Sequence, residues 1–518
     1  MRSSKENVLL YVELCAVLVP VILLRDFTPA NELRYLSIAD EALRNHSFFA
    51  FSNHGVPYAD KPPLYLWLLM LCRRLVGGHS MWLLALLSLL PAWGIVRTMD
   101  SWARREMDAD SRLLARLMLL TCGLFVGMAV TLRMDMLMSF FIVLALRVFW
   151  QMQKGEGNSR KNRWLFPLCL FLAVFTKGPI GLLIPLCGTT VFLVVRRRIG
   201  EFCRYWGGFT WAVLLAGCAL WFGAVYLEGG GGYLCDMLLR QTAGRAIHSF
   251  HHAEPFYYYV VNIWYCLTPW SLLVVGTVVV ALRPKFVRND LQTFFLAVGI
   301  TTIVLLSCIS SKLQVYLLPA IPFLIYATAM FLPRFSENGW LRLALAVPLV
   351  IFAMALPVLL VLTGVQNEPF LHDRLFYIVA TVLTFSGVHS LCLIYGRRKT
   401  VALAIVMRRL ATGLLISLSV GVWTLPRLNV YIGYAEVCRC VLALSQERKI
   451  REVLTWHVSR SENMDVYLHF PVTVVEGDKV PAPAGKSCLL LTRRRYLDSF
   501  QGKETYVIGP YAVVVLKN

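Results

Sequence analysis

The stretch KGEGNSRKNRWLFPLCLFLAVFTKGPIGLLIPLCGTTVFLVVRRR, residues 154–198, holds two apolar runs between two clusters of basic residues. The two runs meet at a short polar turn around Lys177. A helix needs roughly 20 apolar residues to cross a hydrocarbon core, and basic clusters mark the cytoplasmic ends of such helices. The stretch therefore predicts a pair of membrane-spanning helices that begin near Trp164 and Pro179, with Lys177 at their outer end.

The whole chain has the composition of a multi-pass membrane protein. Of its 518 residues, 58% are hydrophobic and only 16% are charged, against roughly 25% charged residues in soluble domains. A net charge of +21 would indicate a nucleic-acid partner if the basic residues formed one soluble face. They stand instead in short clusters between apolar runs, so we expect membrane lipids as partners and no nucleic acid.

The same pattern predicts about thirteen spanning helices. They are expected to begin near Val8, Met81, Leu113, Leu137, Trp164, Pro179, Phe209, Tyr257, Leu291, Gln314, Leu343, Leu375 and Val401. A cytoplasmic N-terminus places all the main basic clusters inside: residues 104–105, 154–163, 196–198, 283–290 and 396–399. An odd number of spans then places the end of the chain outside. The first apolar run lacks a following small-residue cleavage site, so we expect a retained span.

Changes in composition divide the chain into parts. We predict an all-α transmembrane domain over residues 1–425, with a first outer loop over 25–78 that carries helices along the interface. A second outer loop is expected over 227–256, where four glycines permit unusual backbone geometry. Residues 426–518 are expected to form a small α/β domain outside the membrane, with a helix over 434–445 and strands in DVYLHF, TVVEG, CLLLT and YAVVVLK. The 14 cysteines show no metal-binding spacing and predict no disulfide framework.

Among the basic residues outside the cytoplasmic clusters, six are expected at the outer ends of spans. They are Arg34, Lys61, Arg133, Lys177, Arg245 and Lys312. A single residue of this kind can be a side chain that extends to the interface and anchors its helix. Six together favour a site for an anion, and a phosphate attached to a lipid fits the membrane boundary.

Acidic and histidine side chains stand beside these bases. Glu32 follows Asn31, Asp60 precedes Lys61, and Asp135 lies between the third and fourth spans. Carboxylates at such positions can act as general bases or cation ligands, or they can simply neutralise their basic neighbours. In AIHSFHHAEP, His248 and His252 would share one face of a helix, a spacing that suits a divalent metal, although histidines in a loop often bind nothing.

These residues also carry a family resemblance. NELRYLSIADEAL, YADKPPLYLWLL, RMDMLMSFF, FTKGPIGLLIPL, HHAEPFYYYVVNIWYCLTPWSLL and SSKLQVYLLPAIPFL occur in that order. Their order and spacing resemble glycosyltransferase family 39, and more closely the bacterial lipid A aminoarabinose transferase group (ArnT-like) within the GT-C superfamily. The similarity covers about residues 8–327 and extends more weakly to the end of the chain.

The resemblance implies transfer of a monosaccharide from an undecaprenyl-phosphate carrier to an acceptor, on the outer face of the bacterial inner membrane and without a nucleotide cofactor. Roles follow by position. Asn31, Glu32 and Asp135 match acidic, catalytic positions of the family. Arg34, Tyr35 and Lys61 match the part that holds the donor phosphate, to which Lys177, Arg245 and Lys312 would add charge. Asp60 and His252 match a metal-binding acid and histidine, which implies a divalent metal such as Zn, Mg or Mn.

The chain departs from the family at two positions, and one of them bears on the acceptor. Asn31 stands where the family usually has Asp, and Asp60 where it often has Glu. An amide can position an acceptor but cannot take its proton. A phosphate acceptor, such as one on lipid A, is already ionised, so Asn31 favours it over a hydroxyl. Direct displacement would invert the anomeric centre.

Two alternative functions fit part of the same pattern. Transfer to serine or threonine hydroxyls, as in protein O-mannosylation, would use the same donor chemistry. A polyprenyl-lipid transporter would bind the phosphate without a reaction, but its ionisable groups should lie near the bilayer midplane. The clustering of charge at outer ends favours the transferase.

Overall fold

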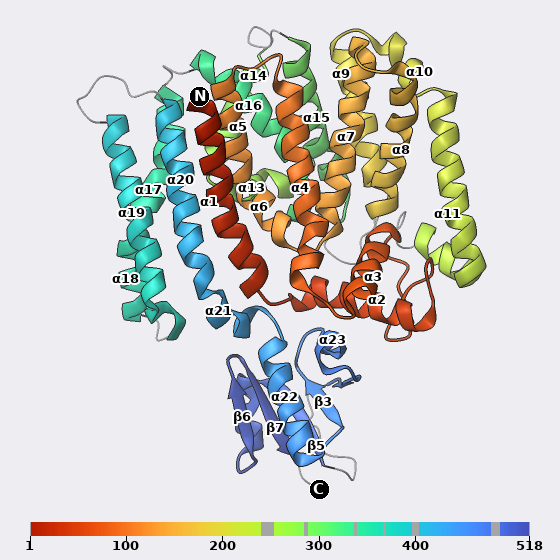
Figure 1. Cartoon of the computed structure of the whole chain (residues 1–518), viewed down its shortest axis with the longest axis vertical. Helices are drawn as coiled ribbons and strands as arrows, with labels where there is room; N and C mark the ends of the chain where they lie inside the picture. Colours follow the sequence, from red (N-terminus) through yellow and green to blue (C-terminus); the bar gives the residue numbers. More distant parts are fainter. Residues whose placement is uncertain are drawn as a thin grey trace. The chain divides into compact units, whose positions relative to one another are not determined.

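The computed structural model describes residues 2–239, 253–283, 289–335, 339–365, 369–395, 403–477 and 487–516. It divides the chain into two compact units (Figure 1). The first contains residues 1–19, 59–65 and 82–421, and the second contains residues 20–58, 66–81 and 422–518. The boundaries that we predicted at residues 425 and 426 for a separate outer domain stay predictions.

The first unit is helical throughout the part of the chain that the structure describes. Its elements are α1 (Arg2–Leu24, which ends in the second unit), α4 (Met81–Ala103), α5 (Ala109–Leu120), α6 (Gly123–Val130), α7 (Met134–Lys154), α8 (Ser159–Lys177), α9 (Ile180–Val195), η2 (Ile199–Glu201), α10 (Phe202–Tyr205), α11 (Gly208–Cys235), α13 (Tyr258–Cys266), α14 (Ser271–Ala281), α15 (Asp290–Cys308), η4 (Gln314–Leu317), α16 (Ile321–Phe335), α17 (Gly339–Ala353), α18 (Ala355–Val365), η5 (Pro369–His372), α19 (Arg374–Tyr395) and α20 (Leu403–Gly421).

Twelve of the thirteen predicted starts lie within a helix or one residue before one, although the helix at Gln314 is the four-residue 3-10 helix η4. The thirteenth, Val401, lies outside the described residues, and α20 begins at Leu403. By length and apolar composition, seven of the described helices could cross a membrane, or eight if the bent pair α5 and α6 counts as one span. Shorter apolar helices occur at residues 10–24, 180–195, 271–281 and 321–333. The membrane helices are therefore confirmed as a class, and the number thirteen stays a prediction.

Aromatic side chains pack between four helices of the first unit. Trp102 of α4 meets Phe295 of α15 edge to face, with ring centroids 5.0 Å apart. Trp150 of α7 contacts Phe294 at 5.4 Å, and Phe192 of α9 meets the same ring at 5.0 Å. Edge-to-face contacts of this kind add to the free energy gained by burial. They fix α4, α7, α9 and α15 against one another, which is the frame on which the site is built (Figure 1).

A tight turn joins α8 to α9 and places Lys177. Gly178 adopts a φ of +97°, which strongly favours glycine, and Pro179 precedes the first residue of α9. Gly181 packs so closely that a Cβ atom there would lie 2.5 Å from the carbonyl carbon of Ala173. The two helices therefore approach at backbone distance, and Lys177 lies at the last position of α8.

We expect Gly181→Ala to destabilise the protein, because the added methyl group collides with backbone atoms that cannot move away without separating α8 from α9. A loss of about 1–3 kcal/mol is typical of such overpacking. The measurement is thermal unfolding of the purified protein in detergent. Gly223→Ala in α11 is the matched control, because a Cβ atom added there would meet no atom within 4 Å. Equal melting temperatures for the two variants would contradict the close-approach argument.

The second unit combines the early outer loop with the end of the chain. Its elements are η1 (Pro29–Leu33), α2 (Arg34–Asn45), β1 (Ser52–Asn53), β2 (Val56–Pro57), α3 (Leu64–Val76, which begins in the first unit), η6 (Val422–Thr424), α21 (Leu425–Ile432), α22 (Ala435–Arg448), β3 (Val453–Trp456), η7 (Ser461–Met464), α23 (Asp465–Leu468), β4 (Thr473–Val475), β5 (Cys488–Arg493), η8 (Arg494–Phe500), β6 (Thr505–Ile508) and β7 (Tyr511–Leu516).

Buried carboxylates hold the early loop together. Asp40 of α2 accepts hydrogen bonds from Arg73 Nε at 2.9 Å and His79 Nε2 at 2.8 Å, which ties α2 to the end of α3. Glu41 accepts a hydrogen bond from the His54 N–H at 2.5 Å, which ties α2 to the β1–β2 hairpin. Burial raises the pKa of Glu41, but hydrogen bonds from Ser52, Gly55 and His54 outweigh it and hold the pKa below its ordinary value of 4.5.

The end of the chain forms a five-stranded mixed sheet in the order β4-β3-β5-β7-β6. Strand β3 runs parallel to both β4 and β5, and β7 is antiparallel to β5 and β6. Leu490 and Val514 are fully buried in the core beneath it. The helix α22 packs on this sheet (Figure 1). Alternating and continuous apolar runs give such strands. The helix expected over 434–445 and the strands expected in TVVEG, CLLLT and YAVVVLK are present.

The strand predicted in DVYLHF is wrong. Residues 465–468 form the short helix α23, and His469 ends it with a left-handed φ of +61°. The cause is tertiary: Ser37 donates to Asp465 Oδ2 at 3.0 Å, and Tyr467 donates to Asp26. These partners lie more than 400 positions away in the sequence, so the local pattern could not indicate them.

The loop predicted over 227–256 begins later in the chain than we expected. Helix α11 continues to Cys235, where a loop was predicted from residue 227. The glycine run does permit unusual geometry within it, because Gly230 has φ +74° and ψ 177° inside the helix. The apolar residues that flank the glycines keep the chain helical on both sides of this break.

Candidate active site

A buried ion cluster lies at the start of α7 and the end of α8. Asp135 is only 2% exposed, and its two carboxylate oxygens bind two different cations. Lys177 Nζ contacts Oδ1, and Arg133 Nε donates to Oδ2 at 3.1 Å. A buried charge is stable only when it is paired and hydrogen-bonded. The cluster carries one net positive charge, so it stays attractive to an anion.

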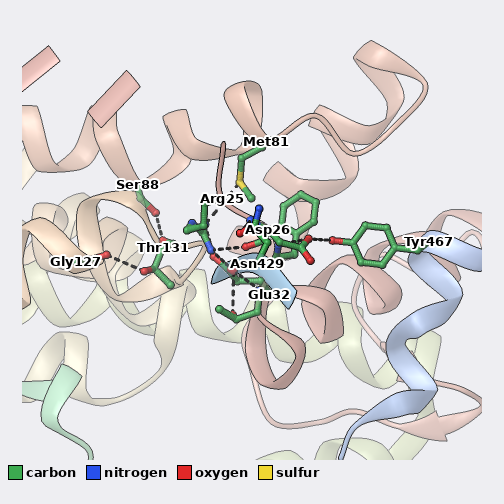
Figure 2. Close-up of polar contacts among 11 residues, drawn as sticks. Arg25, Asp26, Glu32, Met81, Ser88, Gly127, Thr131, Asn429 and Tyr467 are labelled. Atoms are coloured by element: carbon green, nitrogen blue, oxygen red, sulfur yellow. Dashed lines mark hydrogen bonds and ion pairs between the residues drawn. The ribbon is translucent and has the colours of Figure 1, made fainter. Parts of the chain in front are cut away.

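The turn before α7 is held by main-chain and side-chain hydrogen bonds. Ser88 of α4 donates to the carbonyl oxygen of Thr131 at 2.7 Å, and the Thr131 hydroxyl donates to the carbonyl oxygen of Gly127 at 2.7 Å (Figure 2). The N–H of Arg133 then donates to the same Thr131 carbonyl oxygen at 2.9 Å. These bonds fix the direction in which Arg133 and Asp135 leave the turn.

A cavity of about 270 Å³ opens beside Lys177. Its polar lining includes Asp60, Lys61, Lys177 and Ser311, and most of its remaining wall is apolar. The apolar residues are Ala59, Pro62, Met138, Val174, Pro179, Ile180, Leu183, Trp221, Phe222, Met237, Leu238, Leu306 and Ile309, and Tyr316 and Gly178 complete the lining. The ring of Tyr316 lies 4.1 Å from Lys177 Nζ, within cation–π distance. An apolar chamber with two ammonium groups suits a ligand that joins an anion to a hydrocarbon.

Lys61 reaches this cavity from the segment before α3. Its ammonium group pairs with Asp60 Oδ2 at 3.1 Å, and both side chains are largely buried, at 15% and 13% exposed. Pro62 and Pro63 immediately precede Leu64, the first residue of α3. The two prolines therefore lie just before the helix, and α3 begins directly after them.

Lys312 is in the same unit but holds the main chain. It is 3% exposed, and its ammonium group donates to the carbonyl oxygen of Glu254 at 2.8 Å. The Glu254 N–H donates to the Ser310 carbonyl oxygen at 3.3 Å, and Ala253 pairs with Ser311. Lys312 therefore fastens residues 253–254 beside Ser311, which lines the cavity. Its predicted contact with the donor phosphate stays a prediction.

In the second unit, Glu32 is fully buried and saturated with hydrogen bonds. The Arg25 guanidinium binds both of its oxygens, at 2.6 and 2.8 Å (Figure 2). Thr28 donates to Oε2 through its N–H at 2.7 Å and its hydroxyl at 2.9 Å. This bidentate pairing is the strongest arrangement of an arginine and a carboxylate. It makes Glu32 an anchor of the loop, and its predicted catalytic role stays a prediction.

Asn31 lies next to Arg34 and not within the Glu32 cluster. The Asn31 side-chain oxygen accepts a hydrogen bond from Arg34 at 3.4 Å. The Arg34 guanidinium also lies 5.7 Å from the ring centroids of Tyr35 and Tyr58. The amide and the two rings hold the guanidinium in place at the start of α2, as a phosphate-binding arginine requires.

Sequence reasoning missed the partners that hold this loop. Asp26 accepts from Tyr467, and Asn429 accepts from the Asp26 N–H at 3.0 Å (Figure 2). Asp26 also accepts from the Ala435 N–H at 2.9 Å. Arg25, the partner of Glu32, was missed as well. The one available signal was that Arg25 and Asp26 directly follow the first apolar run. Charged side chains that become buried there need partners, because a buried charge without a partner is destabilising.

Two predicted site residues, Arg245 and His252, lie outside the described residues, as does His248. In the part of the chain that the structure describes, no group of three or more His, Cys, Asp or Glu side chains gathers to hold a metal. Asp60 alone does not make a metal site, because its Oδ2 pairs with Lys61. The metal site that combines Asp60 with His252 stays a prediction.

We expect Glu32→Gln to be strongly destabilising, because it leaves the Arg25 guanidinium buried without its counter-charge. Breaking a buried ion pair from one side costs about 3–5 kcal/mol. Thermal unfolding in detergent measures the loss. The control is Glu436→Gln, which breaks the exposed Glu436–Arg439 pair and should change stability little. Wild-type stability of Glu32→Gln would show that the cluster does not anchor the loop.

Comparison with known proteins shows what this chain is similar to. No protein-family model matches the chain. An uncharacterized protein of Aquifex aeolicus (strain VF5) is 29% identical over 329 residues, 61% of this chain and 63% of the relative. The undecaprenyl phosphate-alpha-4-amino-4-deoxy-L-arabinose arabinosyl transferase 1 of Pseudomonas fluorescens (strain Pf0-1) is 24% identical over 312 residues, 56% of this chain and 51% of the relative. The alignments thus span about half to two thirds of these relatives' length.

Other matches extend along more of the chain. An undecaprenyl phosphate-alpha-4-amino-4-deoxy-L-arabinose arabinosyl transferase of Pseudomonas savastanoi pv. phaseolicola (strain 1448A / Race 6) is 23% identical, over 83% of this chain and 82% of its own length. The crystal structure of ArnT from Cupriavidus metallidurans bound to undecaprenyl phosphate superposes with a TM-score of 0.75 at 18% identity, covering 99% of this chain and 98% of ArnT. The resemblance predicted from the sequence is therefore confirmed: the chain is similar in sequence to these arabinosyl transferases, and it shares the fold of the ArnT structure.

Proposed function

We propose that this chain is a membrane glycosyltransferase that takes a monosaccharide from an undecaprenyl-phosphate carrier. The observation that carries the proposal is the cavity with Lys61 and Lys177 in an otherwise largely apolar wall. A polyprenyl phosphate has the same two-part chemistry, and relatives are named as transferases that use undecaprenyl phosphate. We place the reaction on the periplasmic face of the inner membrane, with a cytoplasmic N-terminus and a periplasmic C-terminal end, from the distribution of basic clusters.

The reaction is a displacement at the anomeric carbon of the donor sugar. An acceptor oxygen forms the new C–O bond, and the bond to the carrier phosphate breaks with its electron pair on that phosphate. Negative charge therefore grows on the leaving group as the bond breaks. Ammonium groups that are already positioned stabilise this charge in the transition state. Lys61 and Lys177 fit that role, with Arg34, Tyr35, Arg245 and Lys312 as further donor-binding residues. A single displacement inverts the anomeric centre.

Asp135 is best suited to positioning Lys177. Both of its oxygens bind cations, at Lys177 and Arg133, and this pairing weakens a carboxylate as a proton acceptor. Without Asp135 the Lys177 ammonium would lose its buried partner and turn away from the cavity. Glu32 is similarly committed to Arg25 and Thr28. The cations therefore bind the leaving phosphate, and the acids align these cations.

For the acceptor we propose a phosphate group of lipid A. A phosphate monoester has a second pKa of about 6 and attacks as an anion without needing a base. A serine or threonine hydroxyl would need a free carboxylate to accept its proton. Both Asp135 and Glu32 have their oxygens occupied by hydrogen-bond donors. This geometry, together with an amide at Asn31, favours an acceptor that is already ionised.

A divalent metal remains part of the proposal only through His252. If His252 joins Asp60, the two residues would hold a metal near Lys61, where it would add positive charge beside the leaving phosphate. The described residues by themselves do not form that site. No step of the displacement above depends on the metal.

Lys61→Met should lower transfer about 100-fold or more while the protein still folds, because the variant keeps the stem of the side chain and removes the charge. The assay follows release of undecaprenyl phosphate from a panel of undecaprenyl-phosphate-linked monosaccharides offered to purified protein. Lys61→Arg should recover part of the rate, since it restores the charge with a different geometry. Lys161→Met, at an exposed position of α8, is the control and should keep full activity. Wild-type turnover in Lys61→Met would show that Lys61 does not stabilise the leaving phosphate.

An experiment with a deletion strain tests the acceptor. Deleting this chain should remove a sugar substituent from lipid A phosphate while exported proteins keep their glycans. Mass spectrometry of both fractions, before and after complementation, gives the answer. Unchanged lipid A together with lost protein glycans would favour a hydroxyl acceptor and refute the phosphate assignment. The donor assay on purified protein is separate and would still test the transferase.

A further inference from the structure

A second cavity lies at the other end of α8 from Lys177. It has a volume of about 210 Å³ and is lined by Arg163 and Phe166 of α8, Arg204 of α10, and the first turn of α11 from Gly207 to Thr210. Arg163 and Lys177 lie fourteen positions apart on α8, about 21 Å along the helix axis. The cavity is thus distinct from the proposed active site, and the sugar transfer gives it no role.

The cavity is positively charged, and the charge is not neutralised by the described parts of the chain. The Arg163 guanidinium lies 4.6 Å from the ring centroid of Phe209, at the first turn of α11, and Arg204 contributes the second guanidinium. In the ranges that the structure describes, neither arginine forms an ion pair with a carboxylate. The acid nearest to Arg204 in the sequence, Glu201, accepts the hydroxyl of Tyr205 at 3.1 Å and does not line the cavity.

Three other basic side chains of this unit, Lys154, Arg196 and Arg112, differ in this respect. Lys154 and Arg196 both pair with Asp290, and Arg112 pairs with Asp100 at 3.1 Å. Those cations are matched by structural acids, so they need no ligand. Arg163 and Arg204 face a common polar cavity with no acid in its lining. Two guanidinium groups around one small space are the arrangement that binds phosphate oxygens.

The main chain adds to the same positive potential. The first turn of α11 lines the cavity, and its N-cap residue Gly207 offers no side-chain hydrogen bond to cap the helix. Amide N–H groups at the start of a helix lack intrahelical partners, and the helix dipole is positive there. This contribution supports the two arginines and would not make a site without them.

The surroundings favour a lipid as the source of the phosphate. Trp164, next to Arg163, is 58% exposed, and α8 and α11 carry further exposed apolar side chains at Leu168 and Leu215. A tryptophan beside basic residues is typical of the membrane–water interface. Basic pockets between membrane helices bind the head groups of anionic lipids. A free phosphate ion would make no use of the exposed apolar surface.

We propose that this cavity binds the phosphate group of an anionic phospholipid, with Arg163 and Arg204 as its charged ligands. With the predicted topology, the lipid lies in the cytoplasmic leaflet. The bound lipid would hold α8, α10 and the start of α11 together at that end.

The test measures lipid binding by purified full-length protein in a neutral detergent. Native mass spectrometry measures binding of phosphatidylglycerol and of zwitterionic phosphatidylcholine. A parallel filter assay measures binding of radiolabelled inorganic phosphate. The wild type should retain phosphatidylglycerol in preference to phosphatidylcholine. R163Q/R204Q should weaken phosphatidylglycerol binding about tenfold, as expected for removing two cations near a membrane surface. R160Q/K161Q, two exposed positions on the same helix that do not line the cavity, is the matched control.

Each outcome decides the proposal. Loss of phosphatidylglycerol binding in R163Q/R204Q but not in R160Q/K161Q supports a lipid phosphate. Inorganic phosphate binding that disappears in the same variant, with lipid binding unchanged, refutes the lipid and identifies a site for the free ion. Equal lipid binding by wild type and both variants overturns the site. R163K/R204K, which keeps the charges, should bind more lipid than R163Q/R204Q and guards against a folding defect. None of these measurements depends on the transferase reaction.

Discussion

The pairing of buried charge is the constraint on which the first unit depends. Asp135 is nearly inaccessible, yet it lies among helices built for an apolar environment. It is stable there because Lys177 and Arg133 bind its two oxygens. The pairing in turn requires the α8–α9 turn, which Gly178 and Gly181 allow. One electrostatic requirement thus fixes a helix start, a helix end and the lysine that lines the cavity.

The same physics explains the second unit, where acids anchor the early loop. Glu32 binds Arg25 through both oxygens, Asp26 accepts from Tyr467, and Asp40 joins α2 to α3. Each carboxylate accepts several hydrogen bonds at once, which keeps its charge while removing it from water. The first outer loop is therefore held by buried polar contacts as much as by an apolar core. The acids of this loop hold its structure together. Its arginine Arg34 contacts an aromatic ring and the Asn31 amide.

In the proposed reaction, the cations bind the phosphate and the acids hold these cations in position. A reaction whose leaving group is a lipid phosphate needs fixed cations beside an apolar chamber. Lysines in an apolar environment remain charged and oriented only with buried counter-ions, and Asp135 and Asp60 are those counter-ions for Lys177 and Lys61. The cavity near Lys177 and the basic cavity at the other end of α8 differ in this respect, since only the former contains an acid. The first suits a reaction and the second suits a static head group.

The sequence by itself determined the helical membrane class, because apolar runs and basic clusters are local and periodic. It also determined several strands at the end of the chain. Only the tertiary structure decided that DVYLHF is helical, because its contacts with Ser37 and Asp26 span more than 400 positions. It likewise decided that Arg25 neutralises Glu32 and that Lys177 meets Asp135. Such pairings join segments that no periodicity relates, so charge in a sequence indicates that a partner is needed, and only folding selects it.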